Sequence, residues 1–250
     1  MRNYLSFGGG VNSVALHLHL LDQGDDFESV FVHHGTDWPE TYDYVAGFQW
    51  WLKTNGHRPI TVLRPDAGTT EGERFSVLYD YYHFKKIFPV RAGGALGSGR
   101  TCTHRFKIQV VHKYVEKPCF LYIGIDFDEI RRATGQVDKG VEKRYPLIEA
   151  EITRGGCIEL IKGHGLPAPP KSGCYICPFQ SDQEYKRLRM EYPNLFCKVE
   201  QLENRYIERR KNEGKVPLYI KRKAPIRKII DEDQLQLFEK DEYPPCQCGL

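Results

Sequence analysis

Two cysteines in this sequence are spaced to hold a metal ion or cluster. Cys174 and Cys177 form a Cys-x-x-Cys clip, preceded by Pro-Pro-Lys-Ser-Gly and followed by Pro178. Such a turn presents two thiolates to one ion or iron–sulfur cluster, but it supplies only two ligands. A redox disulfide is the alternative. That chemistry is typical of a clip beside the first strand of a βαβ unit, which is not where this clip lies.

A triple glycine, Gly8-Gly9-Gly10, stands between an apolar segment and a segment with helical spacing. Glycines let backbone N–H groups turn toward one point, and a helix N-terminus adds its positive dipole end there. Asn12 can cap the helix, and the Ser13 hydroxyl can meet a phosphate oxygen. The Lys of the loop Gly-x-x-x-x-Gly-Lys-Ser/Thr is absent. The pattern predicts phosphate binding, with an ordinary tight turn as the alternative.

The segments that must position these residues alternate between two patterns. Apolar runs predict strands at residues 4–7, 29–33, 60–63 and 119–125. Helical spacing predicts helices at residues 13–21, 40–55, 106–115, 157–164 and 182–211. Strands that alternate with helices indicate an α/β protein with a parallel sheet and crossover connections. We expect a nucleotide-binding domain at residues 1–150 and a cysteine-bearing, basic, mostly helical region at residues 151–250.

The segment Ser6-Phe7-Gly8-Gly9-Gly10-Val11-Asn12-Ser13 resembles the pyrophosphate loop (Ser-Gly-Gly-x-Asp/Asn-Ser) of the adenine-nucleotide alpha-hydrolase, or PP-loop, superfamily. Gly8 stands where that pattern usually has Ser. Segments 34–41, 124–132 and 169–179 resemble its phosphoadenylyl-sulfate (PAPS) reductase-like branch. The resemblance implies a Rossmann-like parallel sheet, with helices on both faces, that binds ATP or a sulfonucleotide at the carboxyl ends of its strands.

The resemblance also implies roles for single residues. The phosphates would be held by loop residues, namely Gly8, Gly9, Gly10, Asn12 and Ser13. Asp37 follows the second strand, where the family carries an acidic residue, and the resemblance implies a catalytic role for it. Asp128 and Glu129 occupy its Asp-Glu position and would bind Mg²⁺ or position the substrate; a surface pair at a helix start is the alternative. Arg131 and Arg132 could meet phosphate charge at the same place.

Further metal ligands come from the resemblance as well. It places one at Cys102, and Cys157 is the best candidate for the fourth beside Cys174 and Cys177. Four thiolates suit a [4Fe-4S] cluster or structural zinc, and the family favours the cluster. We expect the remaining two internal thiols, at positions 119 and 197, to be buried packing residues.

The chain ends in Cys246-Gln247-Cys248-Gly249-Leu250. This tail resembles a truncated form of the Glu-Cys-Gly-Leu-His tail of sulfonucleotide reductases, with Gln247 in place of Glu and no His. Two exposed thiols on a frayed tail are the alternative.

The resemblance implies two possible activities. One is ATP cleavage that adenylylates a substrate for sulfur transfer, assisted by the cluster. The other is attack of the Cys248 thiol on the sulfur of a sulfonucleotide. The Asn12-Ser13 ending of the loop favours the first. A non-catalytic zinc protein that binds nucleic acid is a third hypothesis.

Composition limits the class of protein. The 250 residues are 40% hydrophobic and 28% charged, with a mean hydropathy of -0.53. These values exclude a disordered, collagen-like or membrane protein. No apolar run approaches the roughly 18 residues of a membrane helix, and no signal core follows Met1. Eight cysteines without a secretion signal indicate a reducing compartment, so we expect the cytoplasm.

Charge is unevenly distributed along the C-terminal part. Residues 205–228 contain ten basic and two acidic side chains, and the sign reverses over residues 231–242. Clustered Lys and Arg are typical of phosphate binding. The stretch Arg205–Lys228 is therefore a candidate surface for a nucleic-acid substrate, with a solvated helix face and an acidic tail as the alternative. The sequence does not indicate the sulfur donor or a thiol reductant.

Overall fold

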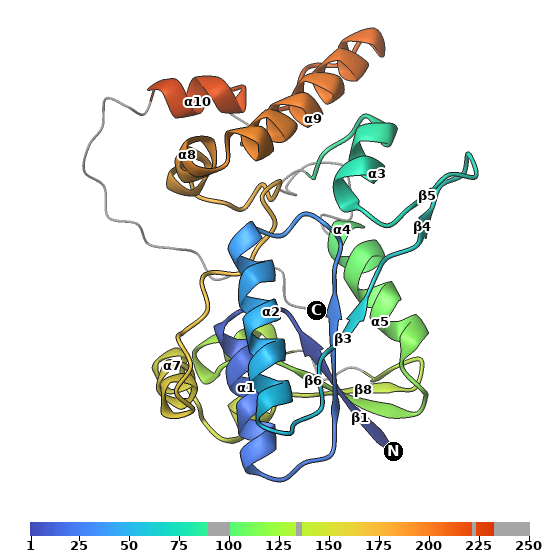
Figure 1. Cartoon of the computed structure of the whole chain (residues 1–250). Coiled ribbons are helices and arrows are strands. Elements are labelled where there is room, and N and C mark those ends of the chain that lie inside the picture. Colours follow the sequence, from blue (N-terminus) through green and yellow to red (C-terminus); the bar gives the residue numbers. More distant parts are fainter. Residues whose placement is uncertain (90–100, 134–136, 222–223, 233–250) are drawn as a thin grey trace. The chain divides into compact units, whose positions relative to one another are not determined.

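The computed structural model describes residues 1–89, 101–133, 137–221 and 224–232 (Figure 1). The chain divides into two compact units that interleave along the sequence. Unit 1 contains residues 1–66 and 103–173, and unit 2 contains the described residues within 67–102 and 174–247. The domain boundary predicted at residue 150 divides the chain by function, with nucleotide binding before it and metal binding after it. This functional division stays a prediction.

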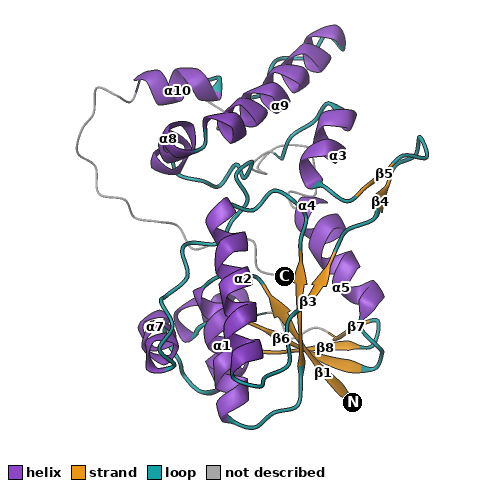
Figure 2. Ribbon diagram, in the orientation of Figure 1, coloured by secondary structure: helices purple, strands orange, loops and turns teal. Residues whose placement is uncertain are grey.

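Unit 1 is built on one sheet with the strand order β3-β2-β1-β6-β8-β7 (Figure 2). The strands are β1 (Arg2–Phe7), β2 (Glu28–Val32), β3 (Thr61–Leu63), β6 (Cys119–Ile123), β7 (Val137–Asp138) and β8 (Val141–Arg144). All neighbours pair in parallel except β7, which runs antiparallel to β8. The expected Rossmann-like α/β fold is confirmed.

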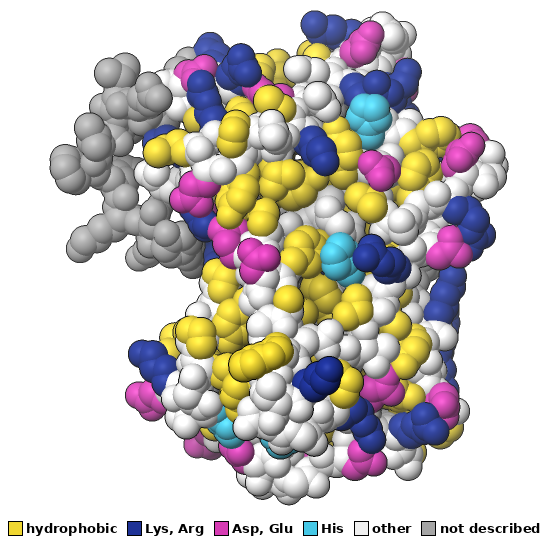
Figure 3. All heavy atoms as spheres, in the orientation of Figure 1, with side chains coloured by type: hydrophobic (Ala, Val, Ile, Leu, Met, Phe, Trp, Pro, Cys, Tyr) yellow, Lys and Arg dark blue, Asp and Glu magenta, His cyan; other side chains and the backbone are white. Residues whose placement is uncertain are grey.

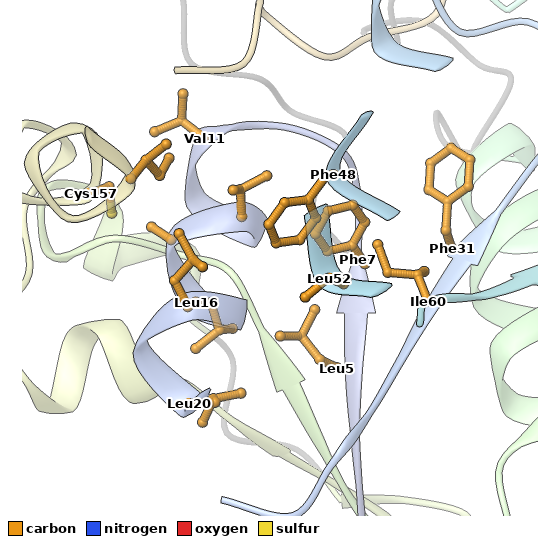
Figure 4. Packing of buried hydrophobic residues seen from close by; sticks show 14 of the residues in the cluster. Leu5, Phe7, Val11, Leu16, Leu20, Phe31, Phe48, Leu52, Ile60 and Cys157 are labelled. Atoms are coloured by element: carbon orange, nitrogen blue, oxygen red, sulfur yellow. The ribbon is translucent and has the colours of Figure 1, made fainter. Parts of the chain in front are cut away.

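Helices cover both faces of this sheet because the strands are apolar on both sides. Along β1, Leu5 and Phe7 pack into one core with α1 (Val11–Asp22), α2 (Pro39–Thr54) and α7 (Arg154–Gly163) (Figure 4). Tyr4 points to the other face and packs with Val111 of α5 (Gln109–Tyr114). Alternation of side chains along a strand produces this two-sided burial. Shorter elements of the unit are α6 (Pro146–Glu149) and the 3-10 helix η2 (Phe127–Arg132).

Two expected helices differ from their predicted form. The segment before α5 consists of α4 (Thr101–Thr103) and a π-helical turn, η1 (His104–Ile108). The predicted helix at 182–211 is two helices, α8 (Asp182–Glu191) and α9 (Pro193–Asn212). A proline lacks a backbone N–H and disfavours helical geometry in the residue before it, so the helix breaks at Tyr192 and restarts with Pro193 in its first turn.

Unit 2 is mostly helical. It contains the hairpin of β4 (Ala67–Gly68) and β5 (Arg74–Phe75), then α3 (Leu78–Lys85), α8, α9 and α10 (Ile226–Glu232). The buried carboxylate of Glu203 on α9 accepts hydrogen bonds from the backbone N–H groups of Ile220 and Ile226, at 2.9 and 2.8 Å. These bonds attach the segment after α9 to the helix. Within the described residues, no helix is both long and apolar enough to cross a membrane.

Candidate functional site

The glycine loop lies at the point where the strand order of the sheet reverses. From β1 the chain continues to β2 and β3 on one side, whereas β6 and β8 lie on the other. The loop at residues 8–10 follows β1, and the segment at residues 124–126 follows β6, its parallel neighbour. In open α/β sheets, ligands bind outside the carboxyl ends of the strands at such a reversal.

The loop has a backbone that requires glycine. Gly9 has φ +72°, and a Cβ atom there would come within 2.9 Å of Val45 and 3.0 Å of Thr41 on α2. Gly10 is the N-cap of α1 with extended backbone. The Ser13 hydroxyl donates to the Gly10 carbonyl at 2.9 Å and accepts from the Gly10 N–H at 3.2 Å. The first N–H groups of a helix have no intrahelical partner, so the loop directs such donors to the strand ends.

The loops after β1 and β6 are in direct contact. A Cβ atom on Gly124 would lie 2.9 Å from the Ser13 nitrogen and 3.0 Å from the Asn12 carbonyl carbon. Real side chains do not tolerate such a separation from backbone atoms. Gly124 is therefore needed for the loop after β6 to approach the first turn of α1.

The side chain of Asn12 lies between two charged residues that sequence reasoning missed. Arg154 donates from Nη1 to Asn12 Oδ1 at 2.6 Å, and the Asn12 side chain also hydrogen-bonds to Asp126. Asp126 is 1% exposed, and this burial raises the pKa of its carboxyl. The available signal for Asp126 was its position immediately after the predicted strand at 119–125. Arg154 had no comparable signal.

The two predicted magnesium ligands have partners within the protein. Asp128 Oδ2 accepts from the Arg154 backbone N–H at 2.8 Å, and Glu129 forms an ion pair with Arg132. Arg131 is exposed on η2. The structure thus brings Asp128 close to the Arg154 backbone, but the roles of Asp128, Glu129, Arg131 and Arg132 in binding magnesium or phosphate stay predictions.

Asp37 is a buried anion at the start of α2. His34 Nε2 lies 3.2 Å from Asp37 Oδ1, and His34 Nδ1 lies 2.7 Å from the Thr36 hydroxyl. Burial alone would raise the pKa of Asp37, but His34 and Lys107 hold it below its ordinary value. Asp37 therefore keeps its charge, and its predicted catalytic role stays a prediction.

A proline-rich connector, residues 166–173, lies against the glycine loop. A Cβ atom on Gly10 would overlap the Ser172 hydroxyl oxygen and lie 3.2 Å from the Ser172 Cβ. One residue further, the carbonyl of Gly173 accepts a hydrogen bond from the Trp38 N–H at 2.9 Å. Ser172 is thus a neighbour of the loop that the sequence alone did not indicate.

Within unit 2, the Cys-x-x-Cys clip is a hydrogen-bonded turn. The Cys177 N–H donates to the Cys174 carbonyl at 2.9 Å, and the Tyr185 hydroxyl donates to the Cys177 carbonyl at 2.9 Å. The residues between the cysteines, Tyr175 and Ile176, are buried, whereas both thiols are half-buried. The buried middle of the turn fixes the clip and leaves its sulfurs partly accessible.

A third thiol of unit 2 lies near the clip. Burial raises the pKa of Tyr82 well above its ordinary value; the thiols of Cys102, which is hydrogen-bonded to Tyr82, and Cys174 raise it further. Tyr185 in turn lies near Cys177 and Cys174. Three half-buried thiols therefore surround two buried tyrosines. However, the described part of the chain holds no group of three or more His, Cys, Asp or Glu side chains placed to bind one metal ion.

The other cysteines have different surroundings. Cys157, the predicted fourth ligand, packs beside Val11 in the core of unit 1, where burial raises the pKa of its thiol to about 12 (Figure 4). Cys119 is buried, as expected. The expectation for Cys197 is wrong: its thiol is exposed, because α9 buries a different face. Cys246 and Cys248 lie outside the described residues.

The basic stretch is partly neutralised by ion pairs within unit 2. Arg209 and Lys215 both contact Glu213, at 2.7 and 2.8 Å, and Lys221 contacts Asp182 at 2.9 Å. On the face of these helices seen in Figure 3, Lys and Arg side chains are interspersed with Asp and Glu. This surface has mixed charge, and its binding of nucleic acid stays a prediction.

No protein-family model matches the chain, and no curated protein does. Among solved structures, the chain is similar to the U34-tRNA thiolase NcsA from Methanococcus maripaludis, determined with its [4Fe-4S] cluster. The identity is 14%, the match covers 97% of this chain and 84% of that chain, and the TM-score is 0.42. The class defined here is a Rossmann-like α/β protein whose glycine loop resembles that of the PP-loop superfamily.

Proposed function

We propose that this chain is a PP-loop enzyme of the PAPS reductase-like branch that binds ATP and activates a substrate for sulfur transfer. The observation that supports this is the glycine loop at the strand reversal. It combines a left-handed Gly9, the extended N-cap Gly10 and the close approach of Gly124. A loop built this way recognises phosphate through backbone N–H groups and needs no lysine.

The reaction consists of two displacements. A substrate oxygen attacks the α-phosphorus of ATP, the bond between that phosphorus and the bridging oxygen breaks, and pyrophosphate leaves. A sulfur nucleophile then attacks the substrate atom that carries the adenylylated oxygen, and AMP leaves with that oxygen. Preorganised N–H donors at the loop would stabilise the charge that develops on the phosphates.

The acidic residues divide between two tasks in this proposal. Asp37 stays ionised beside His34 and is proposed as a catalytic residue. Asp128 and Glu129 are the proposed Mg²⁺ ligands, because Mg²⁺ takes one or two carboxylates together with phosphate oxygens. Both would have to exchange a present partner, Arg154 N–H or Arg132, for the ion.

The cysteines are proposed as a metal centre. Half-buried thiols at positions 102, 174 and 177 suit a thiolate-bound [4Fe-4S] cluster, or zinc in its place. Cys157 is the proposed fourth ligand and would need to leave the core of unit 1. A bound cluster would assist the sulfur transfer. Because the described residues form no complete ligand group, we assign no step of the reaction to it.

A nucleic acid is the proposed substrate class. The stretch Arg205–Lys228 supplies the cations, although several are paired with carboxylates. The carbonyl oxygen of a nucleic-acid base is a group that can be adenylylated in the first step. The competing hypothesis, a sulfonucleotide reductase, depends on the Cys248 thiol.

Calorimetric titration with ATP and an assay of pyrophosphate release test this proposal. We expect binding by the wild type and loss of binding in the Gly10→Val, Ser13→Ala double variant, since its loop can no longer present the N–H groups. Gly47→Ala is the matched control, because Gly47 lies exposed on α2 with open space around it. Binding of a sulfonucleotide without ATP would favour the reductase. No binding of either nucleotide would contradict both enzyme hypotheses.

A further inference from the structure

The guanidinium of Arg154 lies beside the glycine loop, and no carboxylate of the described residues is paired with it. Its Nη1 donates to Asn12 Oδ1, and within the described residues this is the only hydrogen bond of the guanidinium. Its backbone N–H is held separately by Asp128. Arg154 is exposed at the first position of α7, whose core-facing side packs against α1. The side chain thus has four further N–H donors for a ligand at the loop.

The Asn12 amide has a defined polarity. Its carbonyl oxygen accepts from Arg154, so its NH₂ group faces Asp126 and donates to that carboxylate. A carboxylate, an amide and a guanidinium therefore form one chain in which each group satisfies the next. Asp126 is itself fixed, because its Oδ1 accepts from the Glu129 N–H at 3.1 Å.

Other arginines near this site do not have this combination of features. Arg132 is paired with Glu129, which compensates its charge. Arg131 is exposed, but no hydrogen bond within the described residues attaches it to the loop. Of the three described arginines at this place, Arg154 is the one that joins an uncompensated charge to a direct contact with a loop side chain. An uncompensated guanidinium beside N–H donors favours a dianionic phosphate group.

We propose that Arg154 is a phosphate-binding residue of the loop, and that Asp126 and Asn12 are positioning residues that hold its guanidinium there. This inference rests on the proposed function and extends it to a residue outside the loop. The phosphate would accept from the donors of Arg154 that Asn12 does not use. Arg154 would thus add a charge that the glycine loop lacks.

The first test is the affinity of Arg154→Gln for ATP and for inorganic pyrophosphate, measured by calorimetry. A charged hydrogen bond of this kind corresponds to a loss of about tenfold or more in affinity. Lys162→Ala is the matched control, since Lys162 is an exposed cation at the other end of α7. Affinities of Arg154→Gln equal to those of the control would overturn the proposal.

The second test exchanges the amide of residue 12 with the carboxylate of residue 126. Asn12→Asp alone places two carboxylates in contact and should weaken pyrophosphate binding, as should Asp126→Asn alone. The double variant Asn12→Asp, Asp126→Asn restores one amide and one carboxylate and should recover most of the affinity. Equal affinity in all three variants, or no recovery in the double variant, would contradict the positioning role. If the wild type binds neither ATP nor pyrophosphate, the proposed function fails together with this inference.

Discussion

The Ser172 hydroxyl lies over Gly10 so closely that a side chain on Gly10 has no room. Ser172 belongs to the connector that ends at Gly173, and Gly173 is bonded to the Trp38 N–H at the start of α2. The connector thus contacts the glycine loop and the following α2 together. A substitution at Gly10 or at Ser172 should therefore alter the packing of the other residue.

Gly10→Ala should destabilise the protein because the new methyl group overlaps Ser172. Overpacking of this kind costs about 1–3 kcal/mol, which thermal unfolding can measure as a lower Tm. Adding Ser172→Gly should recover most of the loss, since it removes the hydroxyl that the methyl group meets. Gly47→Ala controls for helix propensity and backbone entropy. A wild-type Tm in Gly10→Ala would show that the connector moves away freely.

His17 should make the protein sensitive to mild acid. It is 2% exposed among Phe7, Phe27 and Phe48, and its Nδ1 lies 2.8 Å from the Ser29 hydroxyl. Burial, with a smaller effect of a neighbouring His, lowers its pKa to about 3. The unfolded chain therefore binds a proton near pH 6.5 that the folded protein does not bind.

The free energy of unfolding should then fall as the pH drops below about 6.5, by about 1.4 kcal/mol per pH unit. Between pH 6.5 and pH 5 the wild type should lose about 2 kcal/mol more than His17→Gln, measured by urea unfolding. The difference between the two proteins cancels the contributions of other groups. Parallel pH profiles would mean that His17 accepts a proton in the folded state.

The sheet was predictable from the sequence because its strands follow a local pattern. Apolar runs such as residues 29–33 and 119–125 bury both faces, and β2 and β6 largely coincide with them. The helix break at Tyr192 was missed, although Pro193 is a direct signal for it. The exposure of Cys197 was not predictable, because the buried face of α9 depends on which side of the helix packs against other elements.

The candidate site was predicted where it depends on the loop and missed where it depends on folding. Gly9 and Gly10 have a sequence signature, whereas Asp126 and Arg154 come together only because α7 packs against α1. Hydrogen bonds between residues over a hundred positions apart leave no local pattern. The contact of His34 with Asp37 differs, since these residues are three positions apart and only their burial depends on the fold.

Metal analysis of cysteine variants tests the predicted centre. Cys174→Ala and Cys177→Ala should each lose iron and sulfide, or zinc, after anaerobic purification, because a clip with one thiolate cannot retain the ion. Cys157→Val removes a thiol but keeps an apolar side chain in the core, so the fold should persist. Loss of metal in this variant supports a fourth ligand at Cys157, whereas full retention removes Cys157 from the set. Cys119→Val, at another buried thiol, is the matched control.

The dependence of nucleic-acid binding on salt tests the basic stretch. Each phosphate that the protein neutralises on a single strand contributes about −0.7 to the slope of log K against log salt. Replacing Arg209, Arg210 and Lys211 at the end of α9 with Ala should make the slope shallower by that amount for each phosphate that the variant no longer neutralises. ATP binding should not change.

A substitution of Glu213, which is paired with Arg209, tests the same surface in the opposite direction. Glu213→Gln removes the carboxylate that both Arg209 and Lys215 contact, so two cations become available for phosphate. This variant should bind RNA or DNA more tightly and with a steeper slope than the wild type. A slope that is the same in both variants and the wild type would show that this surface is a solvated helix face. In that case, the proposal of a nucleic-acid substrate for this stretch would be wrong.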